Sequence, residues 1–233
     1  MTKPAGPVRR AASAKQLVPN ILHDQKSVWL YPVRLSEGQH WKPTLVLTLA
    51  TAGLVALDPH DTPYFRRTSR FIQFNNAVSG RNTALAMMIF PGSVYGAGLW
   101  RHDQYAAASA LMAGEAAADS ELLALIMKNI DRRLRPSDIP PDGDFSHTWF
   151  KSHGPVLNGR NAGFPSGHSI GAFSLATVFA CRYREHRWVP WVAYGLAGLV
   201  GFSRITTQAH FPSDVFVGAA LGYAIGQYVS LRQ

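Results

Sequence analysis

The stretch "WVPWVAYGLAGLVGFSRITTQAHFPSDVFVGAALGYAIGQYVSL" (residues 188–231) places two apolar segments on either side of a short polar one. Residues 188–203 and 215–231 carry no charged side chain, and they are too long for strands, which average about five or six residues. Pro190 and Pro212 stand at the two segment starts, where a helix tolerates proline best. The stretch therefore predicts two apolar helices joined by a polar connection.

The polar connection contains an arginine, a histidine and an aspartate. Arg204 and His210 precede the helix that Pro212 would begin, and Asp214 would lie in its first turn. The helix dipole alone favours a carboxylate there. Asp214 can also accept a hydrogen bond from one imidazole nitrogen of His210, which leaves the other nitrogen free as a nucleophile. In that arrangement the positive charge of Arg204 would need an anionic partner.

Four further apolar segments precede this pair and alternate with charged loops. The pattern predicts an all-α protein with six helices, and its 233 residues suit one domain. The stretch 136–163 is rich in Pro, Gly, Asp and His and is predicted to be a long loop, a feature that is often functional. The four further segments span about 43–57, 82–100, 104–130 and 164–181.

The charge balance favours anionic partners. Lys and Arg number 23 against 14 for Asp and Glu, which suits phosphate esters, anionic lipid or nucleic acid. Nucleic acid is disfavoured, because the basic residues sit in short groups between apolar segments rather than on one face with aromatics. The single Cys181 lies in an apolar segment without zinc-ligand spacing and is expected to be a small buried hydrophobe.

Whether the segments span a membrane is open from the sequence. A spanning helix needs about 20 largely apolar residues, and the third segment carries Glu115, Asp119 and Glu121, which are costly in lipid. A soluble helical core is therefore an alternative. The membrane interpretation is favoured because four tryptophans mark segment ends, as an aromatic belt would. They are Trp41, Trp100, Trp188 and Trp191.

The N-terminal part differs from the rest. Residues 1 to about 20 are rich in Pro, Ala and basic side chains and are expected to form a mobile arm. The following stretch "NILHDQKSVWLYPVRL" mixes apolar and charged residues, so it could lie in a membrane interface or cover the flank of the domain. We therefore divide the chain into an arm, residues 1–41, and a main domain, residues 42–233.

Two further stretches have features of an anion site. In "GFPSGHS" (residues 163–169), Pro165 favours a helix start, and the first amides of that helix can bind a phosphate beside His168. In "KNIDRRLRP" (residues 128–136), a continuing helix would bring Lys128 and Arg135 to one face. The intervening Arg132 and Arg133 are expected to be solvated charges. Each stretch alone also suits an ordinary capped helix end.

Together the three stretches resemble the type 2 phosphatidic acid phosphatase (PAP2) superfamily, which is related to bacterial acid phosphatases and vanadium haloperoxidases. The pattern K-x6-R-P, P-S-G-H and S-R-x5-H-x3-D is complete and in order here, over residues 128–214. The resemblance implies a six-helix core bundle of that type and no metal or other cofactor. It also implies a phosphorylated lipid or small phosphate ester as substrate.

The resemblance implies these roles. His210 forms a phosphohistidine, Asp214 orients it, and His168 protonates the leaving group and then activates water. The oxygens of the phosphoryl group are held by cations and backbone amides, the latter at Ser166 and Gly167. The cations are Lys128, Arg135 and Arg204.

Four functions are compatible with this inventory. The favoured one is a bacterial-type inner-membrane phosphatase with an extracytoplasmic site, acting on phosphatidate-like lipids or polyprenyl diphosphates. The first alternative is a soluble periplasmic nonspecific acid phosphatase of the same superfamily. A haloperoxidase that keeps vanadate is disfavoured because the chain is small. An inactive scaffold is disfavoured because no motif position is substituted.

Overall fold

The computed structural model describes residues 13–153 and 162–231, and every regular element in these ranges is a helix, which confirms the all-α prediction. The described elements are η1 (Ala14–Gln16), α1 (Leu17–Trp29), α2 (Tyr31–Ser36), α3 (Trp41–Arg67), α4 (Ile72–Ala77), α5 (Gly80–Trp100), α6 (Gln104–Asp131), η2 (Pro136–Asp138), α7 (Gly167–Arg182), α8 (Trp188–Thr206) and α9 (Pro212–Leu231).

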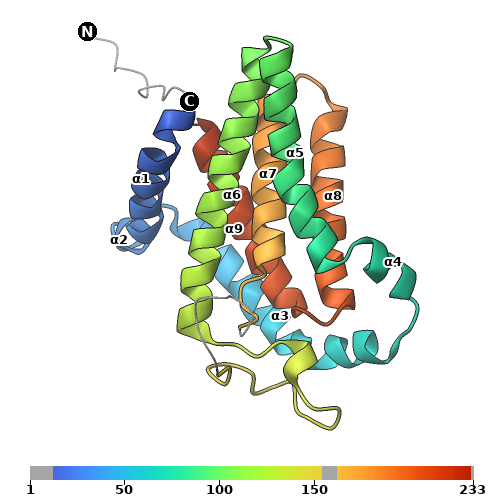
Figure 1. The fold of residues 1–233 in the computed structure, drawn as a ribbon. Coiled ribbons are helices and arrows are strands. Elements are labelled where there is room, and N and C mark those ends of the chain that lie inside the picture. The colour runs from blue at the N-terminus through green and yellow to red at the C-terminus, as the bar shows by residue number, and fades with distance from the viewer. Residues whose placement is uncertain (1–12, 154–161, 232–233) are drawn as a thin grey trace.

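The predicted apolar segments correspond to the long helices. Within the described ranges, six helices have 16 residues or more: α3, α5, α6, α7, α8 and α9. Helix α7 lies at the centre of the bundle, in contact with α5, α6, α8 and α9 (Figure 1). Most of its residues are buried, which suits the run of small and apolar side chains in its sequence.

Helix α9 packs closely on α7 through glycines. Gly218, Gly222 and Gly226 recur every four residues and so share one face of α9. A β-carbon at Gly218 would lie 2.8 Å from the carbonyl oxygen of Ser166, and one at Gly222 would overlap the carbonyl oxygen of Ile170. This close approach holds the start of α9 beside the start of α7.

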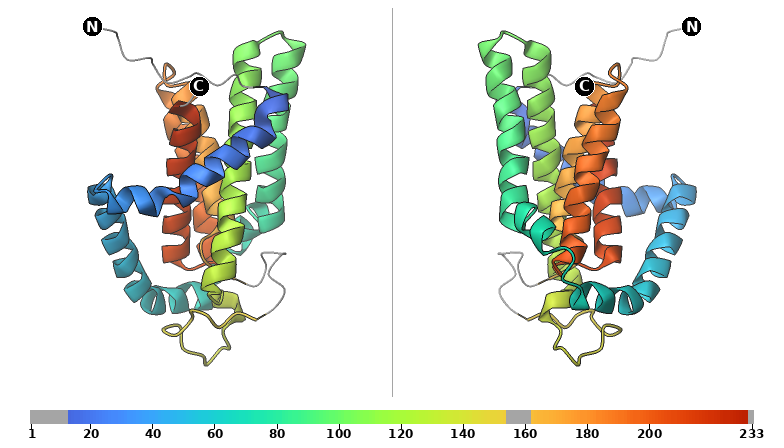
Figure 2. Two further views of the ribbon diagram at one scale, coloured as in Figure 1. Left: turned by 90° about the vertical axis from the view of Figure 1, so that its left-hand side faces the viewer. Right: turned by 90° about the vertical axis from the view of Figure 1, so that its right-hand side faces the viewer.

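Helix α3 diverges from the bundle. Its N-terminal half projects away from the other long helices and its C-terminal half curves beneath them (Figure 2). It continues to Arg67 rather than ending near residue 57, and Pro59 and Pro63 lie inside it, where missing amide donors favour bending. The compact bundle thus consists of α5 to α9. Helix α3 joins it through the buried Asp58, which bonds the start of α9.

Helix α1 covers the flank of α6 with its polar face. Val18 and Leu22 point outward and are 67% and 66% exposed. The Asn20 side-chain amide donates to Glu115 at 3.1 Å. The helix begins at Leu17, earlier than the predicted arm allowed, while residues 1–12 of that arm lie outside the described residues. Its buried side chains are polar: Asn20, Asp24, Gln25 and Ser27.

A band of large apolar side chains covers the outside of the bundle. Helix α5 is long and apolar enough to cross a membrane, and only 17% of its most apolar window is buried. It is the one such helix within the described residues. The exposed side chains of α3, α5 and α8 include Leu45, Val46, Leu49, Met88, Ile89, Phe90, Trp100, Trp188, Trp191, Val192, Leu196 and Leu199.

Candidate active site

The three sequence motifs meet at one end of the bundle. Lys128 lies in the last turn of α6, and His168 lies in the first turn of α7. Arg204 belongs to the last turn of α8, and Asp214 to the first turn of α9, with His210 in the connection between them. Because consecutive helices run in opposite directions, residues from distant parts of the sequence meet at the same end of the bundle.

His210 is held by a backbone carbonyl. Its Nδ1 lies 2.6 Å from the carbonyl oxygen of Gly163 and 3.7 Å from Oδ2 of Asp214. The hydrogen bond expected from His210 to Asp214 is thus made to Gly163 instead. Since a carbonyl oxygen can only accept, Nδ1 carries the proton. The Nε2 lone pair is therefore available for attack on an electrophile.

Buried positive charges surround the imidazole. Burial lowers the pKa of His210 well below its ordinary value of 6.5, and the nearby charges of Lys128 and Arg135 lower it further. The bond to Gly163 acts in the opposite direction, and His168 adds a smaller lowering. His210 is therefore neutral at physiological pH, and three of the predicted site residues lie close enough to influence its charge.

Arg204 and His168 converge at the start of α5. His168 Nε2 lies 2.9 Å from the carbonyl oxygen of Gly80. A β-carbon at Gly80 would lie 2.7 Å from Nη1 of Arg204 and 3.7 Å from Nε2 of His168. The Arg204 guanidinium is oriented by bonds to the Ser203 hydroxyl and the Val78 carbonyl. Glycine at position 80 leaves the space that both side chains occupy.

The start of α7 contributes donors. Ser166 caps the helix by accepting from the Ser169 amide through its hydroxyl. Its own backbone amide donates to the carbonyl of Asp214 at 3.1 Å, so this amide is engaged within the protein. The amides of Gly167 and His168, in the first turn, have no carbonyl partner inside the helix. A β-carbon at Gly167 would lie 3.5 Å from Lys128 Nζ, so the ammonium faces this helix start.

Lys128 and Arg135 do not share a helix face, contrary to the expectation. Helix α6 ends at Asp131, and Arg132 takes a left-handed conformation with φ of 44°. The chain then turns back, and Leu134 donates to the carbonyl of Thr148 in the following loop at 2.9 Å. Arg135 reaches the site from this returning segment rather than from the helix.

The expectation that Arg133 is a solvated charge is wrong. The side chain is 1% exposed and lies between two carboxylates. Its Nη1 lies 2.5 Å from Oδ1 of Asp214, and its Nη2 lies 2.6 Å from Oδ2 of Asp58. Because the turn at Arg132 rotates the next residue off the helix, Arg133 points into the protein and not toward solvent.

Sequence reasoning missed Asp58, Gly80 and Glu121 as neighbours of the site. The Glu121 carboxylate lies beside Gly167 and Gly171, at 3.5 Å and 3.3 Å from the β-carbons those glycines lack. A heptad separates Glu121 from Lys128 on α6, and this spacing could have indicated a shared face. No comparable local signal marks Asp58 or Gly80.

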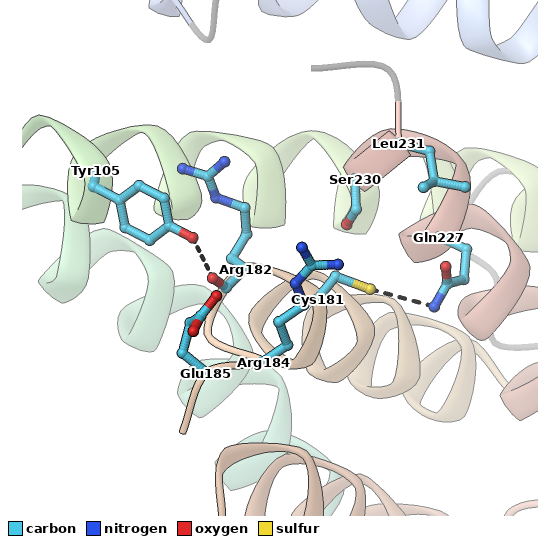
Figure 3. Close-up of a pocket in the computed structure, with 8 residues that line it drawn as sticks. All are labelled: Tyr105, Cys181, Arg182, Arg184, Glu185, Gln227, Ser230 and Leu231. Atoms are coloured by element: carbon cyan, nitrogen blue, oxygen red, sulfur yellow. Dashed lines mark hydrogen bonds between the residues drawn. The ribbon is translucent and has the colours of Figure 1, made fainter. Parts of the chain in front are cut away.

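A pocket of about 400 Å³ lies at the opposite end of the bundle. It is formed where α6 begins and where α7 and α9 end, and it contains no motif residue (Figure 3). Cys181 accepts there from the Gln227 amide, and Arg182 stacks on Tyr105 with 3.8 Å between the guanidinium carbon and the ring centroid. The pocket is thus separate from the candidate site.

The sequence is similar to several phosphatases over part of its length. It is 31% identical over 109 residues to a lipid A 4'-phosphatase of Porphyromonas gingivalis, covering 47% of this chain and 44% of that protein. It is 36% identical over 74 residues to undecaprenyl-diphosphatase BcrC of Bacillus subtilis, covering 32% and 37%. The chain thus spans less than half the length of these relatives.

Two further comparisons concern the fold and the family. A crystal structure of a transmembrane PAP2-type phosphatidylglycerolphosphate phosphatase from Bacillus subtilis aligns with a TM-score of 0.49 and 20% identity, over 89% of this chain and 94% of that one. The family model of the PAP2 superfamily matches residues 107–232, which include all three motifs and more than half of the chain. The chain therefore belongs to the PAP2 superfamily.

Proposed function

We propose that this chain is a metal-independent lipid phosphatase that works through a phosphohistidine at position 210. The observation that carries the proposal is the state of the His210 ring. Its Nδ1 proton is bound by Gly163, its pKa is low, and the charges of Lys128 and Arg135 lie close by. A neutral nucleophile beside fixed cations suits attack on a phosphoryl group, where catalysis is mostly positioning and charge stabilisation.

In the first step, Nε2 of His210 attacks phosphorus and the bond to the leaving oxygen breaks. His168 donates a proton to that oxygen, so the product leaves as an alcohol or, from a diphosphate, as a lipid monophosphate. The positive charges of Lys128, Arg135 and Arg204 and the amides at the start of α7 stabilise the charge on the phosphoryl oxygens.

In the second step, His168 removes a proton from water. The resulting hydroxide attacks phosphorus, the P–N bond breaks, and inorganic phosphate leaves. Asp214 stabilises the positive charge that His210 carries while it is phosphorylated, since its Oδ2 lies 3.7 Å from Nδ1. The engaged amide of Ser166 acts by fixing the starts of α7 and α9 together, and Gly167 supplies the amide that faces the substrate.

A lipid substrate is supported by the surface around the bundle. Large apolar side chains of α3, α5 and α8 are exposed, and grouped exposed apolar side chains mark surfaces that contact lipid or a partner. Helix α1 turns its polar side inward onto Glu115 and Asp119 and its apolar side outward. Such an inversion stabilises a protein in lipid and not in water. The relatives whose names specify lipid A and undecaprenyl diphosphate agree with this class of substrate.

We propose that the chain lies in a bacterial-type inner membrane with its site on the extracytoplasmic side. We take the six predicted apolar segments as membrane spans and place the N-terminus inside. The parts of the chain on the inner side then hold 12 Lys and Arg, and the parts on the outer side, with Lys128 counted there, hold 11. Four of the outer ones belong to the site or its buried network, namely Lys128, Arg133, Arg135 and Arg204, so the remaining charges follow the positive-inside rule. The exposed apolar band disfavours the alternative of a soluble periplasmic acid phosphatase.

The test is phosphate release from a panel of substrates by purified protein in detergent. The panel contains phosphatidate, phosphatidylglycerol phosphate, a lipid A phosphate, a polyprenyl diphosphate and a small soluble ester. We expect a clear preference for one lipid substrate, inhibition by vanadate and no activity in His210→Ala. Equal turnover of all substrates, with full activity in detergent-free extracts, would favour the soluble alternative. Activity in His210→Ala would overturn the proposal.

A further inference from the structure

We propose that Arg133 and Asp58 form a buried relay that positions Asp214 and, through it, His210 for phosphoryl transfer. This inference rests on the proposed function, since it assigns a role in the same reaction. Neither residue reaches the phosphate itself in this assignment. Both are positioning residues: Asp58 lies outside the motifs by which the site was predicted, and Arg133 occupies one of the variable positions of K-x6-R-P.

The Arg133 guanidinium is committed to partners on several elements. Its Nε donates to the Thr148 hydroxyl at 3.1 Å, and its Nη1 donates to the Ser213 hydroxyl at 2.7 Å as well as to Asp214. Phe211 and Trp149 lie over the guanidinium, with 4.1 Å and 4.5 Å from its carbon to the ring centroids. A planar fork fits this arrangement and an ammonium does not.

Asp58 supplies the second negative charge from a distant helix. It is 0% exposed, and both of its oxygens are bonded. Oδ2 accepts from Arg133 at 2.6 Å and from the Ser213 hydroxyl at 2.5 Å, while Oδ1 accepts from the Ser213 amide at 3.2 Å. The carboxylate thereby fixes both the guanidinium and the first turn of α9, where Asp214 lies.

The relay determines which oxygen of Asp214 faces the nucleophile. Arg133 holds Oδ1, so Oδ2 is left to accept from the Phe211 amide at 2.9 Å and to face His210 Nδ1 at 3.7 Å. If Asp58 were neutral, Arg133 would no longer be drawn toward α3, and its hold on Oδ1 would shift. Small displacements of a catalytic group can cost about 100-fold in rate. The relay is therefore expected to affect the chemical step more than substrate affinity.

The experiment compares Asp58→Asn and Arg133→Lys with the control Arg132→Gln. Asn keeps the shape of the Asp58 side chain and removes its charge, and Lys keeps the charge of Arg133 and removes its fork. Arg132 is the preceding residue: its backbone conformation redirects the chain, but its side chain makes none of the contacts of the relay, and Gln removes only its charge. Purified variants are assayed with the preferred substrate of the panel, and rates are expressed per folded site, counted by vanadate binding.

We expect kcat to fall by about 10- to 100-fold in Asp58→Asn and Arg133→Lys, with KM changed by less than about three-fold. The rate of phosphoenzyme formation should fall by the same factor, and Arg132→Gln should match the parent protein. Arg133→Ala should regain activity when methylguanidinium is added, because the small cation can bridge the two carboxylates. A role in stability alone would not produce this recovery.

Normal kcat per folded site in both relay variants would overturn the inference, as would a loss confined to the amount of folded protein. These results remain distinct from failure of the proposed function. If His210→Ala is inactive while the relay variants behave like Arg132→Gln, only the relay is wrong. If His210→Ala still turns over substrate, the proposed function fails, whatever the relay variants do.

Discussion

Gly222 of α9 lies directly against the carbonyl group of Ile170 in α7. A β-carbon at Gly222 would overlap that oxygen, and the neighbouring contacts are also backbone atoms, which cannot rotate away. Gly222→Ala should therefore separate the two helices and lower stability by roughly 1–3 kcal/mol. The control is Gly195→Ala in α8, where the added carbon meets nothing within 4 Å. Its helix propensity should make it neutral or stabilising by about 1 kcal/mol. Thermal unfolding in detergent measures both, and an equal Tm for the two variants would show that the contact is not tight.

Gly80→Ala should impair activity without unfolding the protein. The added carbon would lie 2.7 Å from Nη1 of Arg204, whose guanidinium must then move away from its bonds to Ser203 and Val78. We expect kcat/KM to fall by about 10-fold, corresponding to about 1.4 kcal/mol of lost stabilisation. Gly92→Ala in the same helix meets nothing within 4 Å and serves as the control. An unchanged kcat/KM in Gly80→Ala would mean that Arg204 is not confined at this position.

The long helices were predictable because they are largely apolar runs, most of which have proline or glycine near an end. Their packing into a bundle follows from the same apolar runs. The motif residues lie at the ends of α6 and α8 and at the starts of α7 and α9, which meet because neighbouring helices run in opposite directions. The extension of α3 through Pro59 and Pro63 was not predictable from local rules. Proline favours a helix start on average. Here Asp58 and Thr62 are buried, and Asp58 accepts hydrogen bonds from Ser213 at the start of α9, so the helix is held against the bundle where the prolines interrupt it.

The relay was not predictable from spacing for a different reason. Arg133 faces inward because the left-handed backbone of Arg132 ends α6 and changes the direction of the chain, and a sequence does not show this local conformation. Asp58 lies 75 residues away in sequence from Arg133, so no local pattern connects the two. The hydrogen bond from His210 to Gly163 was likewise hidden, since backbone acceptors leave no mark in a sequence.

The low pKa of His210 predicts the pH dependence of its charge. Burial and the charges of Lys128 and Arg135 disfavour its protonation in the folded protein, so it should titrate well below 6.5. As pH falls through 6.5, the unfolded chain binds a proton that folded His210 does not, and stability should therefore decrease. Carbon-13 NMR of labelled histidine in micelles, assigned with His210→Gln, measures the midpoint. A midpoint at or above 6.5 would contradict the effect that burial and the charges of Lys128 and Arg135 are expected to have on the pKa of His210.

The exposed tryptophans predict contact with lipid. Trp191 is 82% exposed in the first turn of α8, and Trp100 is 84% exposed at the last residue of α5. Both lie at the end of the bundle away from the candidate site. In vesicles, lipids brominated along their acyl chains should quench the fluorescence of a variant that keeps Trp191 alone among its tryptophans. The same variant unfolded in denaturant is the control for access by the quencher. Absence of quenching in folded, vesicle-bound protein would argue that this face lies in water.

The polar contacts of α1 predict that the helix stabilises α6. Gln25 donates to the carboxylate of Asp119 at 2.9 Å, both being buried. Gln25→Leu should leave that carboxylate without this donor and cost roughly 1–3 kcal/mol. Val18→Ala, on the exposed face of the same helix, should have little effect on unfolding in detergent. Equal free energies of unfolding in the two variants would indicate that the polar contacts of α1 do not stabilise the protein.

The most direct measurement is identification of the phosphorylated residue. The variant His168→Asn is mixed with a labelled aryl phosphate, whose leaving group needs no proton, and the reaction is stopped in base because phosphohistidine is labile in acid. Loss of the group that activates water should make the intermediate accumulate. We predict one phosphate per site, located by peptide mass spectrometry at His210 and absent from the double variant that also carries His210→Ala. Label on another residue, or label retained in the double variant, would contradict the account.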